Sequence, residues 1–227
     1  MRKSVQISES IRLGILLALS GGFMDADSYL ARGKVFANAQ TGNMLLLGVH
    51  LSQGHFSLAL HYFFPVCAFA IGIILADIIR SKVTHFFHWR QIAVFIEAII
   101  LLIVSLLPLD MNLLANALTS LSCGIQVESF RKIHGHVIAT TMCIGNLRSG
   151  TESISQYILT KERVYLKKAL LYYGIILCFI VGAIIGNETI QVFHEKAIIG
   201  SCILLIFVSL LMFVDKESKI DVCKESM

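Results

Sequence analysis

The chain has 227 residues, of which 56% are hydrophobic and 15% are charged, with a formal net charge of +4 and a mean hydropathy of +0.76. A soluble domain carries about a quarter charged residues, so this composition excludes a soluble globular domain and indicates an integral membrane protein. Only two prolines occur, and no low-complexity linker divides the chain. We therefore expect a single transmembrane domain over residues 1–227, with the lipid bilayer as its surroundings and no nucleic-acid partner.

Six apolar segments are long enough to be transmembrane helices, since a helix needs roughly 20 residues to cross a hydrocarbon core of ~30 Å. In chain order they are residues 11–30, 58–79, 92–107, 111–130, 169–185 and 197–214. The basic start of the first segment is similar to a secretory signal peptide. Its counterpart inside the chain, at residues 113–124, favours a first helix that is retained.

A motif occurs twice, at residues 16–43 and 118–146. The identical residues 102 positions apart are Leu16/Leu118, Leu19/Leu121, Ser20/Ser122, Gly22/Gly124, Gly33/Gly135, Val35/Val137 and Ala37/Ala139. One inserted residue then aligns Gly42 and Asn43 with Gly145 and Asn146. Paired glycine-interrupted segments in two halves of a membrane chain indicate a substrate site between inverted repeats. The repeats cover about residues 11–107 and 111–214.

Two ambiguous segments, residues 35–51 and 137–159, carry the Gly-Asn motifs. If neither segment crosses the membrane, most Lys and Arg residues fall on the side of the N-terminus, as expected for the cytoplasmic side. If both cross, Arg80, Arg90 and Arg131 fall outside and this bias largely disappears. We therefore predict an all-α helix bundle with about six transmembrane helices and two re-entrant or broken segments. Seven or eight spans are the alternative.

This topology makes the second repeat upside down relative to the first, because each repeat contains an odd number of spans. Both termini are then cytoplasmic. The first motif segment enters from the outside and the second from the cytoplasm. Non-helical backbone at such depth requires a protein cover or a wet cavity.

The Gly-Asn motifs are the first candidates for a binding site. Gly permits a break in a helix and Asn is a good N-cap. A helix that begins near Asn43 would point free N–H groups at an anion or a carbonyl dipole. Close helix packing by small residues is the alternative.

Acidic residues inside apolar segments are the second group of candidates. Asp25 and Asp27 follow the Gly21-Gly22 pair, and the second copy has Glu128 one register away. Such acids usually face the bundle interior, a partner or a cavity; pairing with Arg32 or Lys34 at the interface is the alternative. Glu97, alone in the third apolar segment, is either a proton-relay residue or a hydrogen-bonded structural one.

The predicted substrate-binding residues are polar or glycine residues in and beside the two motifs. They are Asp25, Asp27, Asn38, Gln40, Thr41, Gly42, Asn43, Glu128, Gly145, Asn146 and Arg148. Thr140 and Thr141 add hydroxyl groups nearby, and Arg148 can also form a salt bridge with Glu152. The fourth apolar segment is unusually polar, which suits a helix facing a cavity or another helix.

Other chemistry is not indicated by the sequence. His134 and His136 have weak spacing for a metal site and no evident third ligand. No catalytic signature and no nucleotide-binding loop occurs, and the six cysteines form no CxxC pair. We expect no catalytic residue, no metal and no cofactor.

The stretches GGFMDADSYL and VFANAQTGNMLLLG of the first copy resemble the signature of the YoaK family of bacterial membrane proteins. The second copy departs from that signature, since Cys143 and Ile144 stand where a Thr is expected before Gly145. The resemblance covers most of the chain. It implies a bacterial inner-membrane protein and names no substrate, because the family has no known function.

These features favour a small secondary transporter or facilitator for a small molecule or an ion. A homodimer is a further expectation, because such small repeats can need a second copy. The alternatives are a membrane-embedded enzyme acting on a lipid or amphiphile, and a non-catalytic membrane subunit.

Overall fold

The computed structural model describes residues 10–82, 89–133 and 135–225, and this part of the chain is almost entirely helical. Its α-helices are α1 (Ile11–Ala26), α2 (Gln40–Ser52), α3 (Phe56–Lys82), α4 (Trp89–Leu106), α5 (Asn112–Ser129), α6 (Cys143–Thr160), α7 (Arg163–Phe193) and α8 (Ile199–Glu225). A π-helical turn, η2 (Asp27–Ala31), extends α1, and the 3-10 turns η3 (Leu109–Met111) and η4 (His194–Lys196) precede α5 and α8. The strands β1 (Lys132–Ile133) and β2 (His136–Val137) form an antiparallel ribbon. The predicted all-α bundle is confirmed.

The six predicted spans coincide with α1, α3, α4, α5, α7 and α8. Three helices in the described part are long and apolar enough to cross a membrane: Phe56–Lys82, Trp89–Leu106 and Arg163–Lys196, with mean hydropathies of 2.2, 2.0 and 2.4. Helix α1 has only 16 residues, and α5 carries buried Asn, Ser, Thr and Gln side chains. The two motif segments begin as irregular backbone, at residues 32–39 and 138–142, and continue as α2 and α6.

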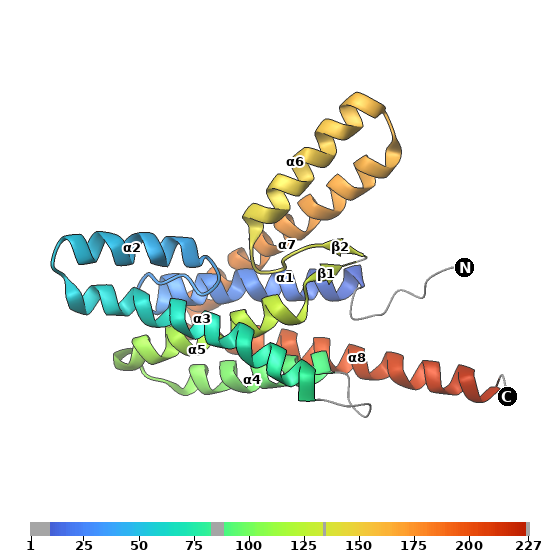
Figure 1. Cartoon of the computed structure of the whole chain (residues 1–227). Coiled ribbons are helices and arrows are strands. Elements are labelled where there is room, and N and C mark those ends of the chain that lie inside the picture. The colour runs from blue at the N-terminus through green and yellow to red at the C-terminus, as the bar shows by residue number, and fades with distance from the viewer. Residues whose placement is uncertain (1–9, 83–88, 134, 226–227) are drawn as a thin grey trace.

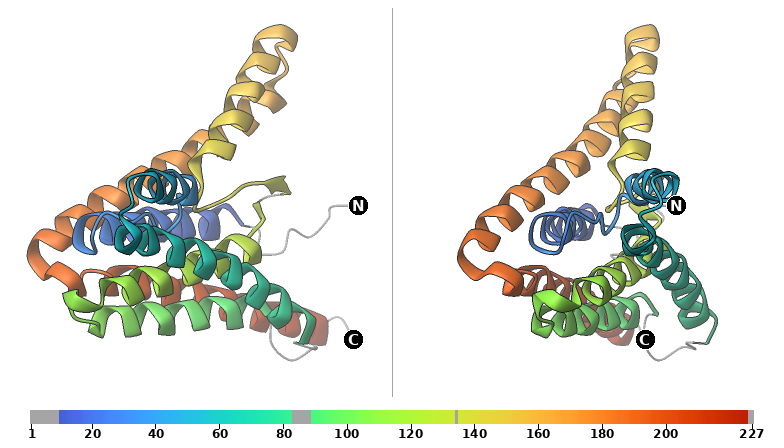
Figure 2. Two further views of the ribbon diagram at one scale, coloured as in Figure 1. Left: turned by 60° about the vertical axis from the view of Figure 1, so that its left-hand side comes forward. Right: turned by 90° about the vertical axis from the view of Figure 1, so that its left-hand side faces the viewer.

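The helices of the two halves pack against each other in matching pairs. When the motif copies are superimposed, α1, α2, α3 and α4 correspond to α5, α6, α7 and α8. Helix α1 packs on α7 as α5 packs on α3, and α1 packs on α8 as α5 packs on α4. Helices α2 and α6 lie along α3 and α7, and α4 packs against α8 (Figures 1 and 2). Each half therefore obtains most of its core from the other half.

Glycine residues bring the helix backbones into contact at two equivalent crossings. A Cβ atom on Gly22 of α1 would overlap the carbonyl oxygen of Phe179 in α7, and one on Gly182 would overlap that of Leu19. At the second crossing, Gly124 of α5 and Gly72 of α3 meet the carbonyl oxygens of Phe69 and Leu121. Only a residue without a side chain allows such an approach.

Outside the bundle, α6 and the first part of α7 form a projecting hairpin (Figures 1 and 2). Large apolar side chains on α6 remain exposed, among them Ile144 and Leu159. The start of α1, the ribbon β1–β2, the end of α3 and the end of α8 lie at one end of the bundle (Figure 1). The α2–α3 turn and the α4–α5 connection lie at the opposite end.

The asparagine of each Gly-Asn motif fastens the loop that precedes it. Asn43 accepts a hydrogen bond from Phe36 N–H (3.0 Å) and donates one to Phe36 O (2.7 Å). Asn146 accepts from Ala139 N–H (3.3 Å) and donates to Ala139 O (2.6 Å). Both residues reach seven positions back along the chain, so both loops are held by the same amide-to-backbone clamp.

The two crossings predict a specific sensitivity to an added methyl group. Gly22→Ala and Gly124→Ala should each lower the free energy of unfolding by about 1–3 kcal/mol, because overpacking moves the backbones apart. Thermal unfolding of the purified protein measures this loss. Gly174→Ala on α7 is the matched control, since no described atom beyond its own helical turn lies within 4 Å of its Cβ position. Equal melting temperatures for all three variants would contradict the crossing geometry.

The clamps predict that Asn43→Ala and Asn146→Ala both destabilise the fold. Each substitution leaves a backbone N–H and C=O of a loop without a partner, at a cost of about 1–3 kcal/mol. Asn187→Ala serves as the control, because the Asn187 side chain donates only to its exposed neighbour Glu188. If the clamp variants melt like the wild type in thermal unfolding, the loops are held by other contacts.

Candidate functional site

The two irregular segments meet on α1 at Gly21, inside the bundle. From the first segment, Asn38 donates through Nδ2 to Gly21 O (2.9 Å). From the second, Thr140 O and Thr141 Cγ2 lie 3.2 and 3.3 Å from the Cβ position of Gly21. Gln126 of α5 donates through Nε2 to Leu17 O and to Thr140 Oγ1, both at 3.1 Å. We call the group Gly21, Asp25, Asn38, Gln126 and Thr141 the loop junction.

Local sequence explains how the first segment reaches this position. The α1 helix widens into the π-turn η2, and Gly33 (φ +91°) and Lys34 (φ +65°) then reverse the chain. Ser28 Oγ of η2 accepts a hydrogen bond from Ala37 N–H (3.1 Å), which holds the returning segment against η2. Gly135 also has a positive φ, +80°, so both copies use their aligned glycine in the left-handed region, where other residues are strained.

Three carboxylic acids lie in or beside the bundle interior. Asp25 is partly buried and accepts a hydrogen bond from Asn38 N–H (2.8 Å). Asp27 and Glu97 are both 0% exposed, and none of their carboxyl oxygens has a hydrogen-bond partner. Burying such groups without partners costs free energy.

Arg32 occupies the end of the bundle near Asp27. Its guanidinium, 1% exposed, donates to Leu107 O (2.8 Å) and Val104 O (2.9 Å) at the C-terminus of α4, where a cation is favoured. Its charge acts on Asp27 through space, without an ion pair within 4.0 Å in the described part of the chain. Lys34 lies over the Tyr29 ring, 4.7 Å from its centre. The alternative of direct acid pairing with Arg32 or Lys34 is therefore not found in residues 10–82.

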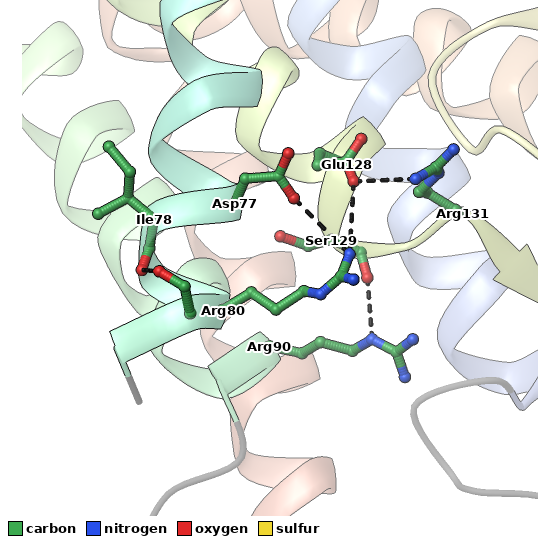
Figure 3. A network of polar contacts seen from close by, with 8 residues as sticks. Asp77, Ile78, Arg80, Arg90, Glu128, Ser129 and Arg131 are labelled. Atoms are coloured by element: carbon green, nitrogen blue, oxygen red, sulfur yellow. Dashed lines mark hydrogen bonds and ion pairs between the residues drawn. The ribbon is translucent and has the colours of Figure 1, made fainter. Parts of the chain in front are cut away.

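Glu128 does not join the loop junction. It lies at the end of α5 beside basic residues, 3.2 Å from Arg131 and 4.0 Å from Arg80, while Arg80 also reaches Asp77 at 3.6 Å (Figure 3). Arg90 of α4 donates to Ser129 O at 2.9 Å in the same region. These contacts join α3, α4 and α5 at one end of the bundle. The register of α5 turns the Glu128 side chain away from Asp25. The structure thus places Glu128 in this network and away from Asp25, and its substrate role stays a prediction.

The remaining predicted residues fall into two groups. Asn43 and Asn146 are occupied by their clamps, and Gln40 donates to Ala37 O (2.7 Å) and Ser120 Oγ (3.4 Å), which fixes the start of α2 on α5. The others lie at or near the surface. They are Thr41, Gly42 against the Phe36 ring, Gly145 and Arg148.

Arg148 lies on the projecting α6. It lines an open groove with Ile144, Leu147 and Glu152, and no ion pair with Glu152 is present among the described side chains. The structure therefore brings Asp25 and Asn38 together and places Arg148 elsewhere.

Gln126 belongs to the loop junction although the sequence analysis did not name it as a ligand, and Thr141, which was expected to add a hydroxyl group nearby, belongs to it as well. The available signal was the unusual polarity of the fourth apolar segment, which contains Gln126. Within the described residues no group of three or more His, Cys, Asp or Glu side chains is placed to hold a metal ion. His134 lies outside those residues.

Comparison with known proteins identifies the family of this chain. The family described as "Protein of unknown function (DUF1275)" matches residues 13–211. A protein of Bacillus subtilis (strain 168) named "UPF0700 transmembrane protein YoaK" is 29% identical over 181 residues, which cover 75% of this chain and 79% of the relative. No solved structure matches the chain. The chain is thus a membrane protein that belongs to the DUF1275 family, as its resemblance to the YoaK proteins predicted.

Proposed function

We propose that this protein is a small secondary transporter or facilitator whose pathway passes the loop junction between α1 and α5. The observation that carries the proposal is the set of interior carboxyl groups, above all Asp27 and Glu97, whose oxygens are buried without partners. Ionisable residues inside membrane helices mark ion and substrate pathways and proton relays. A purely structural acid at these positions would be expected to have hydrogen-bond donors around it.

The irregular backbone supports the same proposal. Residues 32–39 and 138–142 are non-helical and meet in the bundle interior. Such backbone is tolerated at membrane depth only where protein covers it or where it lines a cavity. Transporters with internal repeats use broken segments of this kind near their substrate and ion sites. We assign the coupling or relay role to Glu97 together with Asp25 and Asp27.

An inverted arrangement of the two halves is part of the proposal. Its support is the exchange of equivalent contacts between the halves and the equivalent glycine crossings at Gly22 and Gly124. In such an arrangement the two halves can rock about a fixed site to open it alternately to each side. We place the protein in the bacterial inner membrane with cytoplasmic termini, and we expect a non-enzymatic protein that can form homodimers.

Transport is tested by reconstituting the full-length protein in liposomes on a solid support and recording currents. The probes are defined pools of amino acids, sugars, nucleosides, organic acids and alkali-metal salts. We expect at least one pool to produce a current. Asp27→Asn and Glu97→Gln should reduce that current about tenfold or more, as a barrier raised by about 1.4 kcal/mol does. Asp77→Asn, which removes an exposed acid on α3, should leave the current unchanged.

Two results would overturn the transport proposal. One is a complete absence of current with every pool from protein that is correctly folded and inserted. The other is a current that both interior variants retain in full. Melting temperatures of the variants, measured in parallel, separate a lost pathway from a lost fold.

The proposed topology is tested by cysteine labelling in intact cells, in a variant without native cysteines. His55→Cys, in the α2–α3 turn, should react with a membrane-impermeant maleimide added outside. Val137→Cys in the ribbon, where Val137 is 72% exposed, should react only after the cells are permeabilised, because we assign that end to the cytoplasm. Labelling of both positions from one side would contradict the inverted arrangement.

A further inference from the structure

Three side-chain oxygens in the loop junction have no hydrogen-bond partner. Asn38 Oδ1, Gln126 Oε1 and Thr141 Oγ1 belong to side chains that are 1%, 0% and 2% exposed. Buried polar atoms of this kind are normally satisfied. An unsatisfied group in a native interior therefore requires an explanation, and here three such oxygens lie around one stretch of α1.

The orientation of the two amides is fixed by their nitrogen atoms. Asn38 Nδ2 donates to Gly21 O, and Gln126 Nε2 donates to Leu17 O. Turning either amide over would place its oxygen against a carbonyl oxygen, which is repulsive. The two unpartnered amide oxygens are therefore acceptors, and a ligand that satisfies them must bring positive charge or hydrogen-bond donors. The Thr141 hydroxyl can accept as well as donate.

These acceptors come from separate elements that meet at Gly21. Asn38, in the first irregular segment, donates to Gly21 O at 2.9 Å, and Thr141 Cγ2, in the second, lies 3.3 Å from the Gly21 Cβ position. Gln126 of α5 donates at 3.1 Å to Leu17 O, one turn earlier on α1, and to Thr140 Oγ1. Asp25 lies one turn further along α1 and is joined to Asn38 by its N–H hydrogen bond. Asp25 keeps some exposed surface, whereas the other three side chains are buried.

We propose that the loop junction binds a sodium ion through the Asp25 carboxylate, Asn38 Oδ1, Gln126 Oε1 and Thr141 Oγ1. This inference rests on the proposed transport function, in which sodium is the coupling ion. Because one ligand comes from each irregular segment, the ion links the two repeats and its binding orders both loops together.

The chemistry of the ligands selects a hard monovalent cation. All four donors are oxygen atoms, which suit alkali and alkaline-earth ions rather than soft transition metals. The single carboxylate at the junction balances one positive charge, whereas a divalent ion would leave a buried charge uncompensated. Mg²⁺ also releases its water reluctantly. Between the common alkali ions we choose Na⁺, and the potassium arm of the test below checks this choice.

The test is thermal unfolding of the purified full-length protein in sodium chloride, potassium chloride or choline chloride at equal ionic strength. A ligand that binds only the folded state raises the melting temperature with its concentration. We expect a saturable increase in sodium and none in potassium or choline. Scintillation-proximity binding of radioactive ²²Na⁺ to the same protein provides an independent readout.

Thr141→Val is the informative variant. It keeps the shape of the side chain and removes an oxygen that bonds to no other group. If Thr141 has only a packing role, the variant will retain the sodium effect. If it is a ligand, the sodium-dependent shift and the ²²Na⁺ binding should be lost, while the melting temperature in choline stays equal or rises. Asp25→Asn should also lose the sodium effect.

Thr119→Val is the matched control, because Thr119 is a buried threonine of α5 whose hydroxyl donates to Ala115 O. This variant should retain the sodium-dependent shift. Identical melting in the three salts, or an undiminished sodium shift in Thr141→Val, would overturn the sodium site. A stabilisation that acid alone reproduces in choline would also overturn it, in favour of a proton.

Failure of this site and failure of the transport function are distinguishable. The binding measurements use protein in detergent and need no flux. A solute current without any sodium effect on binding or stability leaves the transport function standing and removes the sodium site. Sodium binding with no current for any pool leaves the sodium site standing and removes the transport function.

Discussion

The contact between helix backbones at the two glycine crossings determines how the rest of the molecule is arranged. Gly22 with Gly182, and Gly124 with Gly72, bring α1 onto α7 and α5 onto α3 without intervening side chains. In a membrane the hydrophobic effect gives little preference for one helix pair over another, so close packing of this kind selects the partners. Since each crossing joins one half of the chain to the other, the halves form a shared core, and the irregular segments meet inside it at Gly21.

The interior that results is held in two different ways. One set of side chains has its hydrogen bonds made: Asn43 and Asn146 clamp the preceding backbone, and Ser20 bonds to Ser201 at 2.5 Å between α1 and α8. Beside these contacts lie oxygens without partners, on Asp27, Glu97 and the loop junction. The completed hydrogen bonds hold the loops in one position. The unpartnered oxygens beside them are therefore preorganised for a ligand. This division between clamp and ligand is the basis for the proposed transport site.

Much of the fold could be predicted because its signals are local. Apolar segments located α3, α4 and α7, and the repeated Gly-Asn motifs marked the places where helices are interrupted. Parts of the site could not be predicted in this way. Glu128 seemed equivalent to the acids of the first copy, yet the register of α5 turns it toward Arg80 on α3. Asn43 was predicted to bind a substrate, and the structure shows its amide in hydrogen bonds with the backbone N–H and C=O of Phe36. This pairing depends on how the loop folds back toward α2.

The sequence by itself determined that this is a helical membrane protein of the DUF1275 family, with two related halves and acids inside apolar segments. Those properties follow from amino-acid composition and from the spacing of residues along the sequence, which are local features of each segment. Only the tertiary structure decided which polar groups share one location. Gln126 and Asn38 are 88 positions apart, yet they bond to Leu17 O and Gly21 O, one turn apart on α1. Helix packing across the two halves brings both irregular segments to this part of α1.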